Sequence, residues 1–276
     1  MQSKSTGRSL MLAVLLFAAS SLSTVAADAA CGAPDVPCKV EGGEYFAALP
    51  EAVGKPPAVI WLHGYARSGK AMIQKPGYVE PFTQRGYAVI MPSGQPFADS
   101  GKLDWGVVDG YDEARDDIAF INAVRADAID RFGLDPSRIL IAGFSRGGSM
   151  VWDLACLAPE MGKAFAPVAG GFWEPMATDC ETPVHLFHTH GFNDRLVPFE
   201  GREVSFQGFD FGQGNVMKGI DVLRRENGCM DSAKNSFDED GAMQKDWDDC
   251  ASGSLRLRLT TGGHGVPKGW REDALD

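Results

Sequence analysis

A serine within the pentapeptide GFSRG, at residues 143–147, is the residue of this chain best placed to act as a nucleophile. The pattern G-x-S-x-G requires a buried strand before it and a helix after it, because the serine must sit on a sharp turn between the two. Both are indicated here, by the apolar run 138–142 and by the helix-like segment 149–155. The glycines leave room where a side chain would clash with the turn. We therefore interpret Ser145 as a catalytic nucleophile rather than as part of a structural glycine turn.

A serine hydroxyl needs a base to remove its proton, and the base needs an acid that holds it in the correct tautomer. Catalytic groups gather at the carboxyl ends of parallel strands, so both partners are expected just after later strands. Asp194 follows the apolar run 184–188 by a short turn, and His264 follows the run 255–259 in a glycine-rich stretch. The order Ser145, Asp194, His264 is the one in which α/β-hydrolases carry these residues.

Such a serine also needs two backbone N–H groups that stabilise negative charge on the attacked carbonyl oxygen. One belongs to the residue after the nucleophile, Arg146. The other is expected in the turn after the early strand 58–62, where the sequence favours the amide of Tyr65 over that of Gly64.

Aromatic residues near these positions are candidate substrate contacts, and we select Trp105, Trp173 and Phe192. Ordinary core packing explains each ring alone equally well. The interval 170–183 is too short for a large helical lid, so some of these rings are expected to be exposed at an open site.

Two patterns raise the question of a metal site. His188 and His190 form an H-x-H pair, and the segment 238–249 is rich in carboxylates. The histidines are expected to lie together near a strand end and to hydrogen-bond loops, and the acidic segment lacks the ligand spacing of an EF-hand. We therefore expect no metal ion and interpret the acidic segment as a solvated face.

Short apolar runs alternate with longer helical stretches along the chain. The runs cover 58–62, 87–91, 138–142, 164–168, 184–188 and 255–259, and a helix is expected from about 112 to 131. This alternation predicts an α/β fold, with a mostly parallel central sheet and helices on both faces. Alternating Leu and Arg in the last run predicts an edge strand with one solvated face. The segment 206–249 is the least regular and is interpreted as an elaboration beside the site.

Together these motifs resemble the polyhydroxybutyrate depolymerase and feruloyl esterase family of secreted esterases. The resemblance covers about residues 31–276 and rests on segments 62–64, 143–148, 190–198 and 262–265. It implies an α/β-hydrolase fold with a minimal cap, ester hydrolysis through an acyl-enzyme, an open aromatic-lined cleft, and no metal or organic cofactor. Arg146 departs from the family pattern, which often has a small residue there, and this places a charge beside the expected nucleophile.

The first 27 residues have the composition of a signal peptide, with basic residues, then the apolar stretch 10–19, then small residues up to Ala27. We expect residues 28–276 to form a single catalytic domain, secreted or periplasmic and monomeric. A lipid anchor on Cys31 is disfavoured, because Asp28 stands where a lipobox needs a leucine-like residue. The formal net charge of −11 argues against nucleic acid and anionic membranes as partners.

An exported chain with six cysteines is expected to form disulfides. Spacing alone leaves about fifteen arrangements open. We favour the sequential pairs, which are near in sequence: Cys31 with Cys38, Cys156 with Cys180, and Cys229 with Cys250. A zinc site is disfavoured because the chain contains no C-x-x-C.

The sequence therefore predicts a secreted serine esterase that acts on a polyhydroxybutyrate-type polyester or oligoester. The first alternative is a carbohydrate esterase that releases feruloyl or acetyl groups from an acylated polysaccharide. A peptidase or an acyl transferase would use the same three side chains. A non-catalytic binding protein on a hydrolase scaffold is disfavoured, because such a scaffold is expected to have lost one of them.

Overall fold

The computed structural model describes residues 31–275 except 34, 52–53, 98–99, 107–114, 207 and 231. The signal-peptide prediction and the expected helix start at residue 112 lie outside the described residues. Within those residues, no helix is both long enough and apolar enough to cross a membrane.

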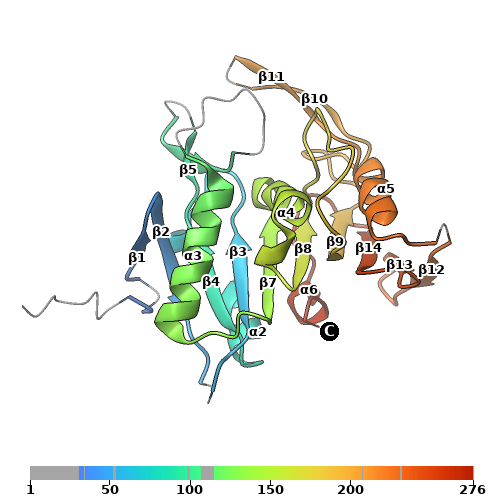
Figure 1. The fold of residues 1–276 in the computed structure, drawn as a ribbon. Helices are drawn as coiled ribbons and strands as arrows, with labels where there is room; N and C mark the ends of the chain where they lie inside the picture. Colours follow the sequence, from blue (N-terminus) through green and yellow to red (C-terminus); the bar gives the residue numbers. More distant parts are fainter. Residues whose placement is uncertain are drawn as a thin grey trace, which may run out of the picture.

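A ten-stranded sheet forms the centre of the molecule (Figure 1). In spatial order its strands are β1 (Cys38–Val40), β2 (Gly43–Ala48), β4 (Ala88–Pro92), β3 (Ala58–Leu62), β7 (Ile139–Phe144), β8 (Ala164–Val168), β9 (His185–Gly191), β14 (Ser254–Thr260), β13 (Met243–Trp247) and β12 (Lys234–Phe237). The six inner strands, from β4 to β14, run parallel. Antiparallel pairs extend the sheet at both edges. The predicted mostly parallel sheet is therefore confirmed.

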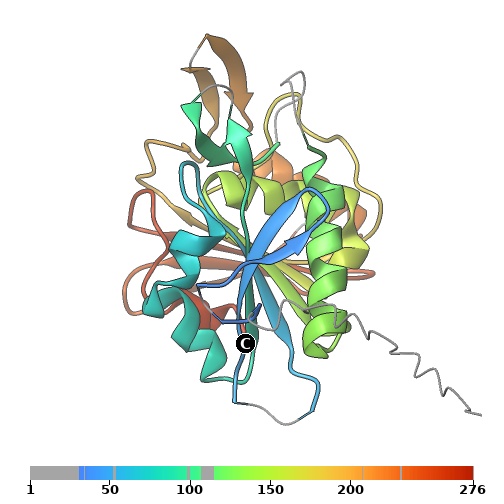
Figure 2. The same ribbon diagram turned by 90° about the vertical axis from the view of Figure 1, so that its left-hand side faces the viewer.

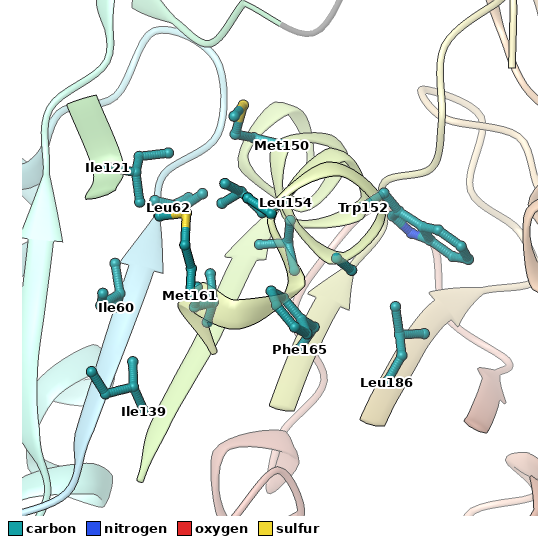
Figure 3. Close-up of a cluster of buried hydrophobic side chains, with 14 of the residues drawn as sticks. Ile60, Leu62, Ile121, Ile139, Met150, Trp152, Leu154, Met161, Phe165 and Leu186 are labelled. Carbon is teal, nitrogen blue, oxygen red and sulfur yellow. The ribbon is translucent and has the colours of Figure 1, made fainter. Parts of the chain in front are cut away.

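Helices cover both faces of this sheet, which is why the inner strands are apolar on both sides. The helices α3 (Asp117–Phe132), α4 (Arg146–Leu157) and α5 (Val216–Glu226) pack on one face. The helices α1 (Gly69–Ile73), α2 (Pro76–Thr83) and α6 (Trp270–Asp273) pack on the other. Figure 3 shows part of the core on the α3, α4 and α5 face, to which Trp152 and Leu154 of α4 and Phe165 of β8 all contribute buried side chains.

Two hairpins rise beyond the carboxyl ends of the parallel strands (Figures 1 and 2). One is formed by β5 (Gln95–Phe97) and β6 (Lys102–Asp104), and the other by β10 (Arg202–Phe206) and β11 (Phe209–Gln213). Residues 169–184, between β8 and β9, contain no helix. This agrees with the predicted minimal cap.

Two details of the predicted architecture are wrong. The run 255–259 is not at an edge, because β13 and β12 continue the sheet beyond β14. Leu255 and Leu257 are buried, whereas Arg256 and Arg258 form ion pairs with Asp246 and Asp238. The Leu-Arg alternation thus marks a buried face of leucines and a partly exposed face on which each arginine pairs with an aspartate. The segment 206–249 is also more regular than expected, since it contains β11, α5, β12 and β13.

The helix α3 ends at Phe132, next to the expected residue 131, and its described start is Asp117. Its N-cap is Asp116, whose side chain accepts a hydrogen bond from the amide of Ala119 at 3.0 Å. Its C-cap is Gly133, with a φ of 63° that suits glycine. The cap at Asp116, which satisfies a helix-terminal amide, sets the start of the helix.

The three sequential disulfide pairs are the ones present in the structure. Cys156–Cys180 ties α4 to the segment before β9, and Cys229–Cys250 joins the chain after α5 to the turn between β13 and β14. The second of these braces the strand that leads to His264.

We expect the double substitution Cys229→Ser/Cys250→Ser to lower the free energy of unfolding. The bond joins two residues that are 21 positions apart. Closing a loop of that size lowers the conformational entropy of the unfolded chain and stabilises the folded protein by about 3 kcal/mol. Urea unfolding of both proteins under non-reducing conditions measures the difference. An unchanged unfolding midpoint would contradict a stabilising role for this bond.

Candidate functional site

Ser145 lies on the sharp turn between β7 and α4, with a φ of 59° and a ψ of −121°. A residue with a side chain is strained in this conformation, so the surrounding structure must hold it there. Its N–H donates to the carbonyl of Val168 at 2.9 Å, and its own carbonyl accepts from the N–H of Ser149 at 2.9 Å. A Cβ on Gly147 would lie 2.2 Å from the carbonyl oxygen of Leu62, so only glycine lets α4 begin this close to β3.

The imidazole of His264 bridges Ser145 and Asp194. Its Nε2 lies 2.9 Å from Oγ of Ser145, and its Nδ1 lies 2.7 Å from Oδ2 of Asp194. A carboxylate only accepts hydrogen bonds, so Nδ1 carries the proton and Nε2 is left to accept the serine O–H. The structure therefore brings together the three side chains that the sequence singled out, in the order nucleophile, base, acid.

Asp194 is buried but remains a strong acceptor. Its Oδ1 accepts from the amides of Leu196 and Val197, each at 2.9 Å. Burial on its own would raise the pKa of Asp194, but the hydrogen bonds from His264 and from these amides lower it below the ordinary value. The carboxylate is thus ionised where it accepts the hydrogen bond from Nδ1 of His264.

The loops that carry the acid and the base are joined by their backbones. The N–H of Phe192 donates to the carbonyl of Thr260 at 2.8 Å, and the N–H of Asn193 donates to that of Gly262 at 2.9 Å. A Cβ on Gly191 would lie 2.2 Å from the carbonyl oxygen of Gly263. Because β9 and β14 are neighbours in the sheet, Asp194 and His264 are held as one unit.

The pair His188 and His190 is engaged in a buried chain of hydrogen bonds. The indole N–H of Trp152 donates to Nδ1 of His188 at 3.3 Å, so Nε2 of His188 carries the proton toward Nδ1 of His190 at 3.0 Å. His190 in turn donates from Nε2 to the carbonyl of Val197 at 2.8 Å. Burial lowers the pKa of both rings, which are therefore neutral.

The acidic segment 238–249 is occupied by ion pairs: Asp238 with Arg258, Asp246 with Arg256, and Asp248 with Lys234. Across the ranges that the structure describes, no group of three or more His, Cys, Asp or Glu side chains is placed to hold a metal ion.

Sequence reasoning missed His63, which orients one of the expected oxyanion donors. Its Nε2 accepts from the N–H of Gly94 at 2.9 Å, so Nδ1 carries the proton and donates to the carbonyl of Gly64 at 2.9 Å. That carbonyl and the N–H of Tyr65 belong to one planar peptide and point in opposite directions. His63 therefore sets the direction of the Tyr65 amide. The second donor, the amide of Arg146, is the first N–H of α4 and has no acceptor within the helix.

The three aromatic candidates have different surroundings. Trp105 is only 1% exposed, and its N–H donates to the carbonyl of His63 at 2.7 Å, so it packs beneath the site instead of facing a substrate. Trp173 is 9% exposed, between the guanidinium of Arg146 and the ring of Phe211. Phe192 is 67% exposed beside the Asp194 loop. Of the three, Phe192 offers a surface to a bound molecule.

Known proteins resemble this chain in sequence and in fold. The phospholipase/carboxylesterase family matches residues 49–209. A probable feruloyl esterase C of Aspergillus niger is 25% identical over 56% of this chain and 52% of its own length. The chain spans about half the length of the curated relatives it matches.

Two solved structures show the α/β-hydrolase fold of the chain. An acetyl xylan esterase from Aspergillus awamori superposes with a TM-score of 0.59 at 18% identity, covering 84% of this chain and 92% of that one. A carboxylesterase of Bacillus cereus superposes with a TM-score of 0.57 at 15% identity, covering 85% and 92%.

We expect the free energy of unfolding to fall as the pH drops below about 6.5. Burial lowers the pKa of His63 to about 4 and also lowers those of His188 and His190. The unfolded chain therefore binds protons that the native protein does not, and each histidine contributes a slope of up to about 1.4 kcal/mol per pH unit. Urea unfolding between about pH 7.5 and about pH 5 measures this slope. Equal stability across that range would show that these rings are not held neutral.

Proposed function

This chain belongs to the phospholipase/carboxylesterase family, and we propose that it is an exported serine esterase with Ser145, His264 and Asp194 as its catalytic residues. The observation that carries the proposal is the hydrogen-bond chain from Asp194 through His264 to Ser145. In that chain the carboxylate of Asp194 accepts a hydrogen bond from Nδ1 of His264, which leaves Nε2 to accept the hydroxyl proton of Ser145.

The reaction follows from these positions. His264 Nε2 takes the proton of Ser145 as Oγ attacks the ester carbonyl carbon, and Asp194 stabilises the imidazolium that forms. The amides of Tyr65 and Arg146 donate to the tetrahedral oxyanion. His264 then protonates the leaving alcohol, and the acyl group remains on Ser145. Water repeats the sequence in the second half, releasing the acid and restoring the serine hydroxyl.

For the substrate, we place feruloyl or acetyl esters of a polysaccharide before hydroxybutyrate polyesters. The Aspergillus niger relative reported above is named as a probable feruloyl esterase. The exposed ring of Phe192 also suits an aromatic acyl group. The predicted signal peptide together with three disulfides supports export to an oxidising compartment.

The substitution Ser145→Ala should abolish hydrolysis of p-nitrophenyl acetate, with a loss of at least about 1,000-fold in kcat, because no other group supplies the nucleophile. The fold should persist, as measured by circular dichroism. The matched control is Ser252→Ala, which changes an exposed serine just before β14, at the opposite end of that strand from His264. This variant should retain full activity. Retained turnover in Ser145→Ala would refute the assignment of the nucleophile.

Phe192→Ala should lower kcat/KM for methyl ferulate by about two- to tenfold and leave p-nitrophenyl acetate nearly unaffected, because only the larger acyl group contacts the ring. The matched control is Phe237→Ala, which removes another exposed phenylalanine, on β12. Rates on methyl ferulate, acetylated xylan and hydroxybutyrate oligomers, measured in parallel, rank the substrate classes. A wild-type enzyme that prefers hydroxybutyrate oligomers would reverse our order.

A further inference from the structure

The side chain of Arg146 makes contacts that ester hydrolysis does not by itself require. Its Nε lies 2.8 and 3.0 Å from the two carboxylate oxygens of Asp104, and its Nη2 donates to the carbonyl of Trp105 at 2.9 Å. The guanidinium also lies 4.7 Å from the centre of the Trp173 ring. The side chains of Arg146 and Asp104 are only 14% and 6% exposed. These contacts hold the charge of Arg146 in place beside the nucleophile.

Arg146 occupies a position in α4 that is unfavourable for a positive side chain. Arg146 is the first residue of the helix, where the helix dipole disfavours a positive side chain. Asp104 neutralises that charge from outside the helix. Burial raises the pKa of Asp104, and the guanidinium of Arg146 opposes that shift. Each member of the pair therefore compensates for a charge that would be unfavourable without the other.

The segment that carries Asp104 also contacts the other side of the site. The indole N–H of Trp105 donates to the carbonyl of His63, and the N–H of Ala66 donates to the carbonyl of Leu103 at 2.9 Å. Residues 103–105, at the end of β6, thus bind the turn 63–66 directly. The same residues bind the first residue of α4 through the guanidinium of Arg146.

We propose that the Asp104–Arg146 ion pair braces the oxyanion site, by fixing the distance between the backbone segments that carry the Tyr65 and Arg146 amides. Asp104 and Arg146 are positioning residues in this role, and the inference rests on the function proposed above. Charge-assisted hydrogen bonds are short and directional, so the pair resists small relative shifts of β6 and α4. A donor that shifts loses stabilisation of the oxyanion but little affinity for the neutral ester.

The test is a double-mutant cycle of Asp104→Asn, Arg146→Met and both together, with kcat and KM measured on p-nitrophenyl acetate. We expect each single variant to lose about ten- to a hundredfold in kcat with KM nearly constant. The double variant should lose about as much as either single variant, because both substitutions break the same brace. Inhibition by a trifluoromethyl ketone, which forms a tetrahedral adduct with the serine, should weaken in parallel with kcat/KM.

The control is Arg256→Met, which removes an arginine that also pairs with an aspartate, Asp246, and also lies over a ring, that of Phe187. It should lower stability without changing the affinity for the ketone. Variants at 104 and 146 that lose only thermal stability and keep kcat would overturn the proposal. Recovery of kcat in the double variant would overturn it as well, because an uncompensated charge would then explain the losses. The function itself is tested separately, by the activity of the wild-type protein and its loss in Ser145→Ala.

Discussion

The close approach of α4 to β3 is the constraint on which the geometry of the site depends. Because the backbone of Gly147 lies against the carbonyl of Leu62, the chain must turn sharply at Ser145 and adopt a positive φ there. The turn lifts the hydroxyl out of the sheet and leaves the first amide of α4 without a helical acceptor. Nucleophile and oxyanion donor therefore follow from one packing contact, and the strain at Ser145 is balanced by the core beneath α4.

The other catalytic side chains depend on the sheet. Asp194 and His264 follow adjacent parallel strands, whose register pairs Gly191 with Thr260. Their loops are then joined by backbone hydrogen bonds, so the acid and the base keep their spacing with respect to each other. Ser145 follows β7, which is separated from β9 by the single strand β8. The site is thus assembled at the carboxyl edge of the sheet, on elements that are rigid within the core.

Four of the five histidines in this protein serve two different purposes. His63, His188 and His190 are buried, neutral connectors that each use both ring nitrogens in hydrogen bonds. His264 alone among these four contacts Ser145 and is partly exposed. The side chain of Arg146, unlike its backbone amide, is similarly removed from direct chemistry, because Asp104 neutralises its charge. The ionised carboxylate of Asp194 is therefore the charge that acts directly on the proposed base.

The sequence by itself determined the features that depend on residues close together in the chain. The turn at Ser145 follows from its glycines, and the inner strands follow from their apolar runs. The order of Asp194 and His264 after strands indicated their place at one edge. The sequence favoured the sequential disulfides, because each pair is near in the chain, but the structure was needed to choose them among the possible arrangements. Contacts between distant segments were decided only by the tertiary structure, because strand order and hairpin placement are not encoded in any single stretch. For this reason β14 is an inner strand, Trp105 and His63 support the oxyanion turn, and Arg146 finds its partner in Asp104.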